Sequence, residues 1–120
     1  MPMNSNIMQK KEIKVYLKDD AKESYFQLKK KSDKESQLLL SSIERIMNLL
    51  NLNPQLGNPI PKKQFPKQLI LKRNINNLYR IELSRFWRLL YTIKNDEIYI
   101  YLIILKITDH KEYNKLFRYK

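Results

Sequence analysis

Three basic side chains in the second half of the chain have the types and the spacing to act on a phosphate. Arg80 and Arg88 fall in consecutive strand-like segments, so they can converge on one face of an antiparallel sheet. A guanidinium group can bind two phosphate oxygens at once, which suits arginine to this task. The only histidine, His110, follows the last strand-like segment, and histidine serves as a general acid or base near neutral pH. Together these residues indicate acid–base chemistry at a phosphate.

Each of these side chains also has a purely structural explanation. Arg80 and Arg88 could lie on a solvated sheet face, where Glu82 would form an ion pair with an arginine across the strands. A lone histidine is more often structural than catalytic. The functional interpretation therefore depends on several residues acting together.

The composition excludes most other kinds of site. The chain has 120 residues, of which 42% are hydrophobic, enough for the core of one domain. It has no cysteine, which excludes disulfides, thiolate metal sites and a cysteine nucleophile. One histidine excludes a multi-histidine metal site, and one glycine, Gly57, excludes a glycine-rich phosphate loop. We expect neither a metal ion nor a small-molecule cofactor.

The net charge indicates a polyanionic partner. Lysine and arginine number 24 against 12 acidic residues, a net charge of +12. Residues 1–61 carry 10 basic and 7 acidic side chains, whereas residues 62–120 carry 14 and 5. Such an excess favours nucleic acid over membrane as the partner. The alternative is compositional drift, since the chain is also rich in lysine, asparagine and isoleucine.

The first half of the chain predicts one strand followed by two helices. Apolar and polar residues alternate over residues 12–17, which is typical of a strand. Helices are expected over about 19–31 and 32–50, joined so closely that they form an antiparallel hairpin. The expected start signals are Asp19 and Asp20 for the first helix and a capping box of Ser32 and Glu35 for the second.

The second half predicts a sheet and a short helix. A proline-containing loop over residues 51–66 separates it from the helical hairpin. The expected elements are strands over 68–72, 78–83, 86–93 and 98–107, then a helix from a capping box of Asp109 and Glu112 through Phe117.

These elements predict an α+β fold. We expect an antiparallel β-sheet meander, with the N-terminal helical hairpin packed on one face and a short C-terminal helix. Residues 12–120 should form a single domain behind a flexible N-terminus at 1–11. The longest apolar run, 98–105, has eight residues, whereas a bilayer span needs about 20. No secretory signal is visible, so a soluble, cytoplasmic protein without membrane contact is expected.

The alternation of side chains predicts which sheet face carries the basic residues. Arg80, Glu82 and Arg88 should share the face turned away from the helical hairpin, among exposed apolar neighbours such as Phe86 and Leu90. The opposite face, buried under the helices, should carry Tyr79, Ile81, Leu83, Trp87, Leu89, Tyr91 and Ile93.

The same segments resemble the RelE/ParE superfamily, the toxins of type II toxin–antitoxin modules. The resemblance rests on LYRIEL at 78–83, FWRLLY at 86–91, the apolar strand that follows, and DHKEY at 109–113. The loop at 60–67, with Pro61, Lys62 and Lys63, is also similar to RelE-like members. The order and length of the N-terminal elements agree with the family, so the resemblance extends over most of residues 12–117.

A RelE-like chain implies a metal-free endoribonuclease that cuts mRNA on the ribosome and so inhibits translation. By matched position, Arg88 would bind the scissile phosphate, and Arg80 matches a basic position of the preceding strand. His110 and Tyr113 match the C-terminal element that supplies acid–base or base-stacking groups. Further contacts to mRNA and ribosomal RNA are expected from Lys62, Lys63, Lys67, Lys72, Arg73, Arg85 and Lys111.

One position departs from the family pattern. Glu82 stands where the best-known RelE members carry a second lysine. This carboxylate could be the catalytic base, or it could be a structural partner of Arg80 in a weakened site. ParE-type members share the fold but poison DNA gyrase and lack the ribonuclease site, and a catalytically inactive RNA-binding relative is a third possibility.

The resemblance also implies a protein partner. Toxins of this kind are held by a cognate antitoxin whose amphipathic segment wraps the toxin. A surface with a net charge of +12 would attract an acidic, partly disordered chain of that sort.

Overall fold

A computed structural model describes residues 11–118 and shows an α+β fold built on a five-stranded mixed sheet. The flexible N-terminus predicted for residues 1–11 lies, apart from Lys11, outside the described residues. In chain order the elements are β1 (Glu12–Leu17), α2 (Asp19–Lys29), α3 (Lys34–Leu50), β2 (Asn58–Pro59), the 3-10 turn η1 (Lys62–Gln64), α4 (Lys67–Arg73), β3 (Tyr79–Glu82), the 3-10 turn η2 (Ser84–Phe86), β4 (Arg88–Asn95), β5 (Tyr99–Thr108) and α5 (His110–Phe117).

The sheet follows the order β1-β5-β4-β3-β2. Strands β3, β4 and β5 pair antiparallel in succession, as the hairpin signals predicted. Strand β1 instead runs parallel to β5, so the prediction of a wholly antiparallel meander is wrong. The reason is the helical hairpin: α2 and α3 carry the chain across the sheet before β2, which leaves β1 to pair with a strand distant in sequence.

A second prediction is wrong at residues 68–72, which form most of helix α4 rather than a strand. The apolar spacing there fits both structures, and glutamine, leucine and lysine are good helix formers. In a helix, residues two positions apart point to different sides, so Leu69 is buried whereas Leu71 is 85% exposed. The helix starts after Pro66 and ends at Asn74, which adopts a left-handed conformation with φ of 50°.

The caps of α3 and α5 agree with the predictions to within a residue, whereas the N-cap predicted for α2 from Asp19 and Asp20 is wrong. Helix α3 is capped by Asp33, whose carboxylate accepts a hydrogen bond from the Ser36 amide at 3.0 Å, rather than by Ser32. That hydrogen bond lowers the pKa of Asp33. Helix α5 is capped as predicted by Asp109, which accepts from the Glu112 amide at 2.8 Å. Helix α2 has Asp19 and Asp20 in its first turn but no side-chain cap.

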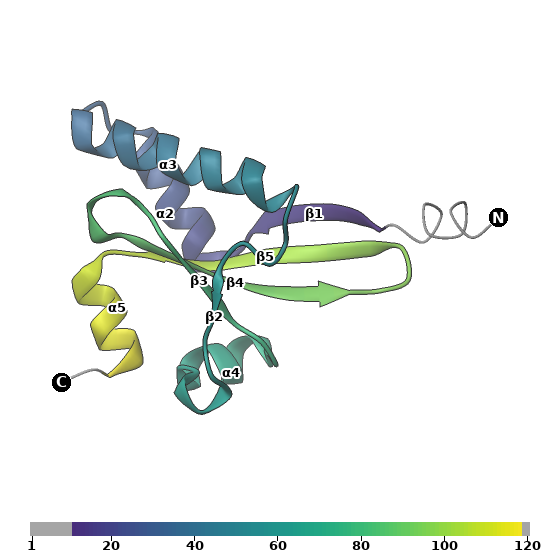
Figure 1. The fold of residues 1–120 in the computed structure, drawn as a ribbon. Coiled ribbons are helices and arrows are strands. Elements are labelled where there is room, and N and C mark those ends of the chain that lie inside the picture. Colours follow the sequence, from purple (N-terminus) through teal and green to yellow (C-terminus); the bar gives the residue numbers. More distant parts are fainter. Residues whose placement is uncertain (1–10, 119–120) are drawn as a thin grey trace.

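Helices cover both faces of the sheet (Figure 1). The hairpin of α2 and α3 packs on one face, where the predicted apolar set lies: Ile81, Leu83, Leu89 and Tyr91 are buried, with Tyr79, Trp87 and Ile93 partly buried against them. Helices α4 and α5 pack on the opposite face around a second apolar cluster, composed of Phe65, Leu69, Ile75, Leu78, Leu90, Leu105 and Tyr113.

The second core corrects the expectation of an open face beside the arginines. Phe86 is 76% exposed, as predicted, but Leu90 is completely buried. The sequence did not predict α4 as a helix, so nothing in the strand pattern indicated that its Leu69 would join Leu90 in a buried cluster. The basic side chains therefore lie at the end of a packed core rather than on a bare sheet.

Among residues 11–118, no helix is both long enough and apolar enough to cross a lipid bilayer.

Candidate functional site

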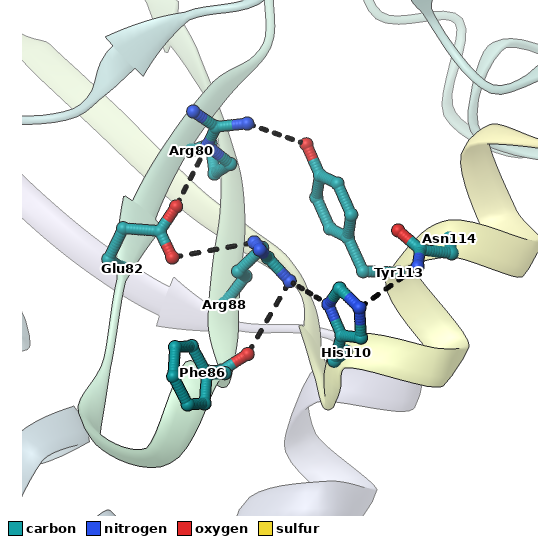
Figure 2. A network of polar contacts seen from close by, with 7 residues as sticks. All are labelled: Arg80, Glu82, Phe86, Arg88, His110, Tyr113 and Asn114. Atoms are coloured by element: carbon teal, nitrogen blue, oxygen red, sulfur yellow. Dashed lines mark hydrogen bonds and ion pairs between the residues drawn. The ribbon is translucent and has the colours of Figure 1, made fainter. Parts of the chain in front are cut away.

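The candidate site forms where the register of the sheet brings β3, β4 and the start of α5 together (Figure 2). Glu82 and Arg88 are directly paired across β3 and β4, and Arg80 lies two residues along β3 on the same face. On the other side of β4, Arg88 is paired with Thr108, the last residue of β5. Because α5 begins two residues later, at His110, the histidine lies beside Arg88.

Glu82 lies between the two guanidinium groups. Its two carboxylate oxygens are 3.4 Å from Arg80 Nε and 3.4 Å from Arg88 Nε. At these distances the contacts are ion pairs rather than well-aligned hydrogen bonds. The side chains are 52% exposed for Glu82 but only 33% and 16% for Arg80 and Arg88. One carboxylate thus holds two partly buried cations side by side.

Tyr113 contacts both arginines. Its hydroxyl accepts a hydrogen bond from Arg80 Nη1 at 3.1 Å, and the Arg88 guanidinium lies 4.5 Å from its ring centroid. The ring is also stacked on Phe117 and is only 2% exposed. A ring so buried has no face open to a nucleobase, so the stacking role expected for Tyr113 does not fit. Tyr113 is a positioning residue.

His110 completes the network at the exposed end of Arg88. Arg88 Nη1 lies 3.3 Å from His110 Nδ1, and His110 Nε2 lies 3.2 Å from the side-chain amide of Asn114. The Asn114 side chain places its amide nitrogen, Nδ2, 3.2 Å from Nε2 (Figure 2). Arg88 Nη1 and Asn114 Nδ2 are both donors, whereas a neutral imidazole has one accepting nitrogen, so the ring accepts from one of the two at a time.

A pocket of about 750 Å³ opens beside this network. Arg88 and His110 form part of its lining. The rest consists of the exposed ring of Phe86 and three charged side chains, Arg85, Asp109 and Lys111. The Asp109 carboxylate is engaged as the cap of α5, and Arg85 is 3.4 Å from Glu35 at the surface. The volume falls in the range of small-ligand sites, about 300–1,000 Å³.

The structure divides the predicted RNA-binding residues into three groups. Arg85 and Lys111 line the pocket beside Arg88. Lys63 and Lys67 line a separate hollow of about 300 Å³ against the end of α5, and Lys62 is exposed in the same turn, η1. Arg73 pairs with Asp19, and Lys72 lies near Asp20. Only the first group adjoins the candidate site.

The third group, Lys72 and Arg73, lies beside Asp19 and Asp20 in the acidic first turn of α2. Asp20 also accepts a hydrogen bond from Lys106, which lowers the pKa of Asp20. These ion pairs join α2 to α4 and β5. The charge on Arg73 is therefore used within the fold, and the prediction that it contacts RNA has no support in the geometry.

Sequence reasoning overlooked Asn114 as a member of the site. A signal was present, because Asn114 follows His110 by four residues on a predicted helix, and such residues are neighbours on the helix surface. Its contact with Nε2 orients the imidazole ring toward Arg88.

The described residues offer no metal centre: within 11–118, no group of three or more histidine, aspartate and glutamate side chains lies close enough to hold an ion.

Comparisons of the chain with protein-family models, with curated proteins and with solved structures found no match.

Proposed function

We propose that this chain is a RelE-like toxin of a type II toxin–antitoxin system, an endoribonuclease that cleaves mRNA on the ribosome in the cytoplasm. The observation that carries the proposal is the network of two guanidiniums, one carboxylate and one imidazole, joined at 3.3–3.4 Å beside an open pocket. Cleavage of RNA by its own 2′-hydroxyl needs a proton acceptor, cations for the phosphate and a proton donor. The network contains all three kinds of group.

In the proposed reaction, Glu82 accepts the proton of the ribose 2′-hydroxyl, and the oxygen attacks the adjacent phosphorus. Arg88 and Arg80 stabilise the added negative charge on the phosphorane. The bond to the 5′-oxygen breaks, and the leaving oxygen takes a proton from His110 in its imidazolium form, which leaves the ring neutral. Turning Arg88 toward the phosphate also releases His110 Nδ1, which its guanidinium otherwise engages at 3.3 Å.

The test is a primer-extension assay on ribosomes translating a defined mRNA. Wild-type protein should produce cuts at fixed positions relative to the codon in the decoding site. Glu82→Gln should reduce cleavage about 100-fold or more, because the amide keeps the shape of the side chain but does not accept a proton as a base. Glu97→Gln, at an exposed acidic residue in the β4–β5 turn, is the matched control and should cleave like wild type.

A second candidate is a relative that binds RNA without cleaving it. One observation favours it: both oxygens of Glu82 are already paired with guanidiniums, so neither is free to contact a ribose hydroxyl. Absence of cuts by the wild-type protein would support this candidate and contradict the ribonuclease. DNA-damage signalling without mRNA cleavage would instead indicate a gyrase-directed toxin.

The proposed partner is a cognate antitoxin with an acidic, amphipathic segment. Support comes from the net charge of +12 and from the outer surface of α4, where Leu71 is 85% exposed between the exposed Lys67 and Lys72. We expect the chain to co-purify with the product of an adjacent small open reading frame and to arrest growth without it. A chain that purifies alone and is harmless when expressed would contradict this proposal.

A further inference from the structure

The side chain of Phe86 lines one side of the pocket beside Arg88. Phe86 lies in η2, the turn between β3 and β4, and is 76% exposed. A large aromatic ring exposed to this extent is unfavourable in water. Figure 2 shows the ring beyond Arg88, on the opposite side from Tyr113. Since Tyr113 is buried, Phe86 is the aromatic side chain that lines the pocket.

The backbone holds Phe86 in this position at an energetic cost. Arg85 and Phe86 have φ angles of 59° and 64°, in the left-handed region that residues other than glycine rarely adopt. Hydrogen bonds on both sides fix the turn: the Leu83 amide donates to the Trp87 carbonyl at 2.8 Å and the Trp87 amide to the Ser84 carbonyl at 3.2 Å. The Phe86 carbonyl lies 3.5 Å from Arg88 Nη1. The turn therefore couples the exposed ring to the arginine.

We propose that Phe86 is a stacking platform for an unpaired nucleobase next to the phosphate held by Arg88, with Lys111 and Arg85 contacting the flanking backbone. Aromatic side chains on which bases stack, combined with cations that follow the phosphates, are the usual elements of single-stranded RNA binding. The pocket combines one aromatic ring with Arg85, Arg88 and Lys111, and its volume of about 750 Å³ accommodates a nucleotide. The proposal rests on the proposed function for the choice of RNA as ligand.

The test measures binding without cleavage. The probe is a fluorescently labelled RNA tetranucleotide with 2′-O-methyl ribose at every position, which blocks the attacking hydroxyl. It is titrated with free protein at low salt, and binding is followed by anisotropy. Phe86→Ala should weaken binding about fivefold or more, the loss expected for one stacked base. Phe86→Leu should weaken it similarly, and Phe86→Tyr should retain it. Phe26→Ala, which removes a ring that is 47% exposed on α2, is the matched control and should bind like wild type.

The outcomes separate this inference from the proposed function. If Phe86→Ala loses binding but wild-type protein leaves mRNA intact, the nucleobase site stands and the ribonuclease does not. If wild type cleaves mRNA while Phe86→Ala and Phe86→Leu bind the probe and cleave normally, the ribonuclease stands and the nucleobase site is overturned. Failure of the wild-type protein to bind the probe, or a Phe86→Ala defect confined to capture of a protein partner, would also overturn it.

Discussion

Replacing Arg88 with alanine is expected to reduce ribosome-dependent mRNA cleavage by a factor of about 100 to 1,000. This is the loss typical of removing one group that stabilises negative charge in a transition state. Arg88 is also the residue through which the site is connected, since it contacts Glu82, His110 and the Tyr113 ring. The variant therefore loses the cation and the positioning of the imidazole together. Primer extension on translating ribosomes measures the effect.

Two further variants make the result specific to the guanidinium group. Arg45→Ala removes an exposed arginine on α3 and should cleave like wild type. Arg88→Lys keeps the charge but loses the planar fork that reaches Glu82 and His110 at once, so it should recover only part of the activity. The urea midpoint of Arg88→Ala should stay close to that of wild type. Normal cleavage by Arg88→Ala would remove Arg88 from the reaction.

The arrangement of the site was largely predictable because it depends on local rules. Alternation along β3 places Arg80 and Glu82 on one face, and a tight turn into β4 brings Arg88 opposite Glu82. The position of His110 follows from the length of β5, since the helix begins where the strand ends. None of these inferences needs contacts between segments distant in sequence.

The sheet order and the second core were not predictable for the opposite reason. The pattern of residues 12–17 indicates a strand but not its neighbour, and the parallel pairing with β5 joins segments more than 80 residues apart. The seven-residue α4 is too short for its apolar spacing to distinguish a helix from a strand. The burial of Tyr113 depends on that helix and on Phe65 and Leu69, which pack in the same cluster.

The position of Glu82 between Arg80 and Arg88 explains why an acidic side chain is stable there. Two guanidiniums held close together repel each other, and the partly buried positions of Arg80 and Arg88 reduce the screening by solvent. A carboxylate between them offsets that repulsion and fixes their separation. In the proposed reaction, the same carboxylate would accept the proton of the 2′-hydroxyl once the arginines turn to a phosphate, so the structural and the catalytic explanation of Glu82 are compatible.

Replacing Leu90 with alanine should lower the free energy of unfolding by about 2–5 kcal/mol, the range for removing a buried leucine side chain. Leu90 is fully buried on β4, in the cluster that also contains Tyr113 and Leu105. The truncated side chain would leave a cavity in the cluster that also holds Tyr113, the residue in contact with both arginines. Urea unfolding followed by circular dichroism measures the loss.

The matched control is Leu71→Ala on α4, which shortens a leucine that is 85% exposed and should change the free energy of unfolding by less than about 0.5 kcal/mol. The pair separates the two possible arrangements of this sheet face. If α4 and α5 pack on it, the cost appears at Leu90 alone. If the face were open, as the strand pattern predicted, both variants would unfold near the wild-type midpoint, and the support of Arg80 and Arg88 by Tyr113 would fail with it.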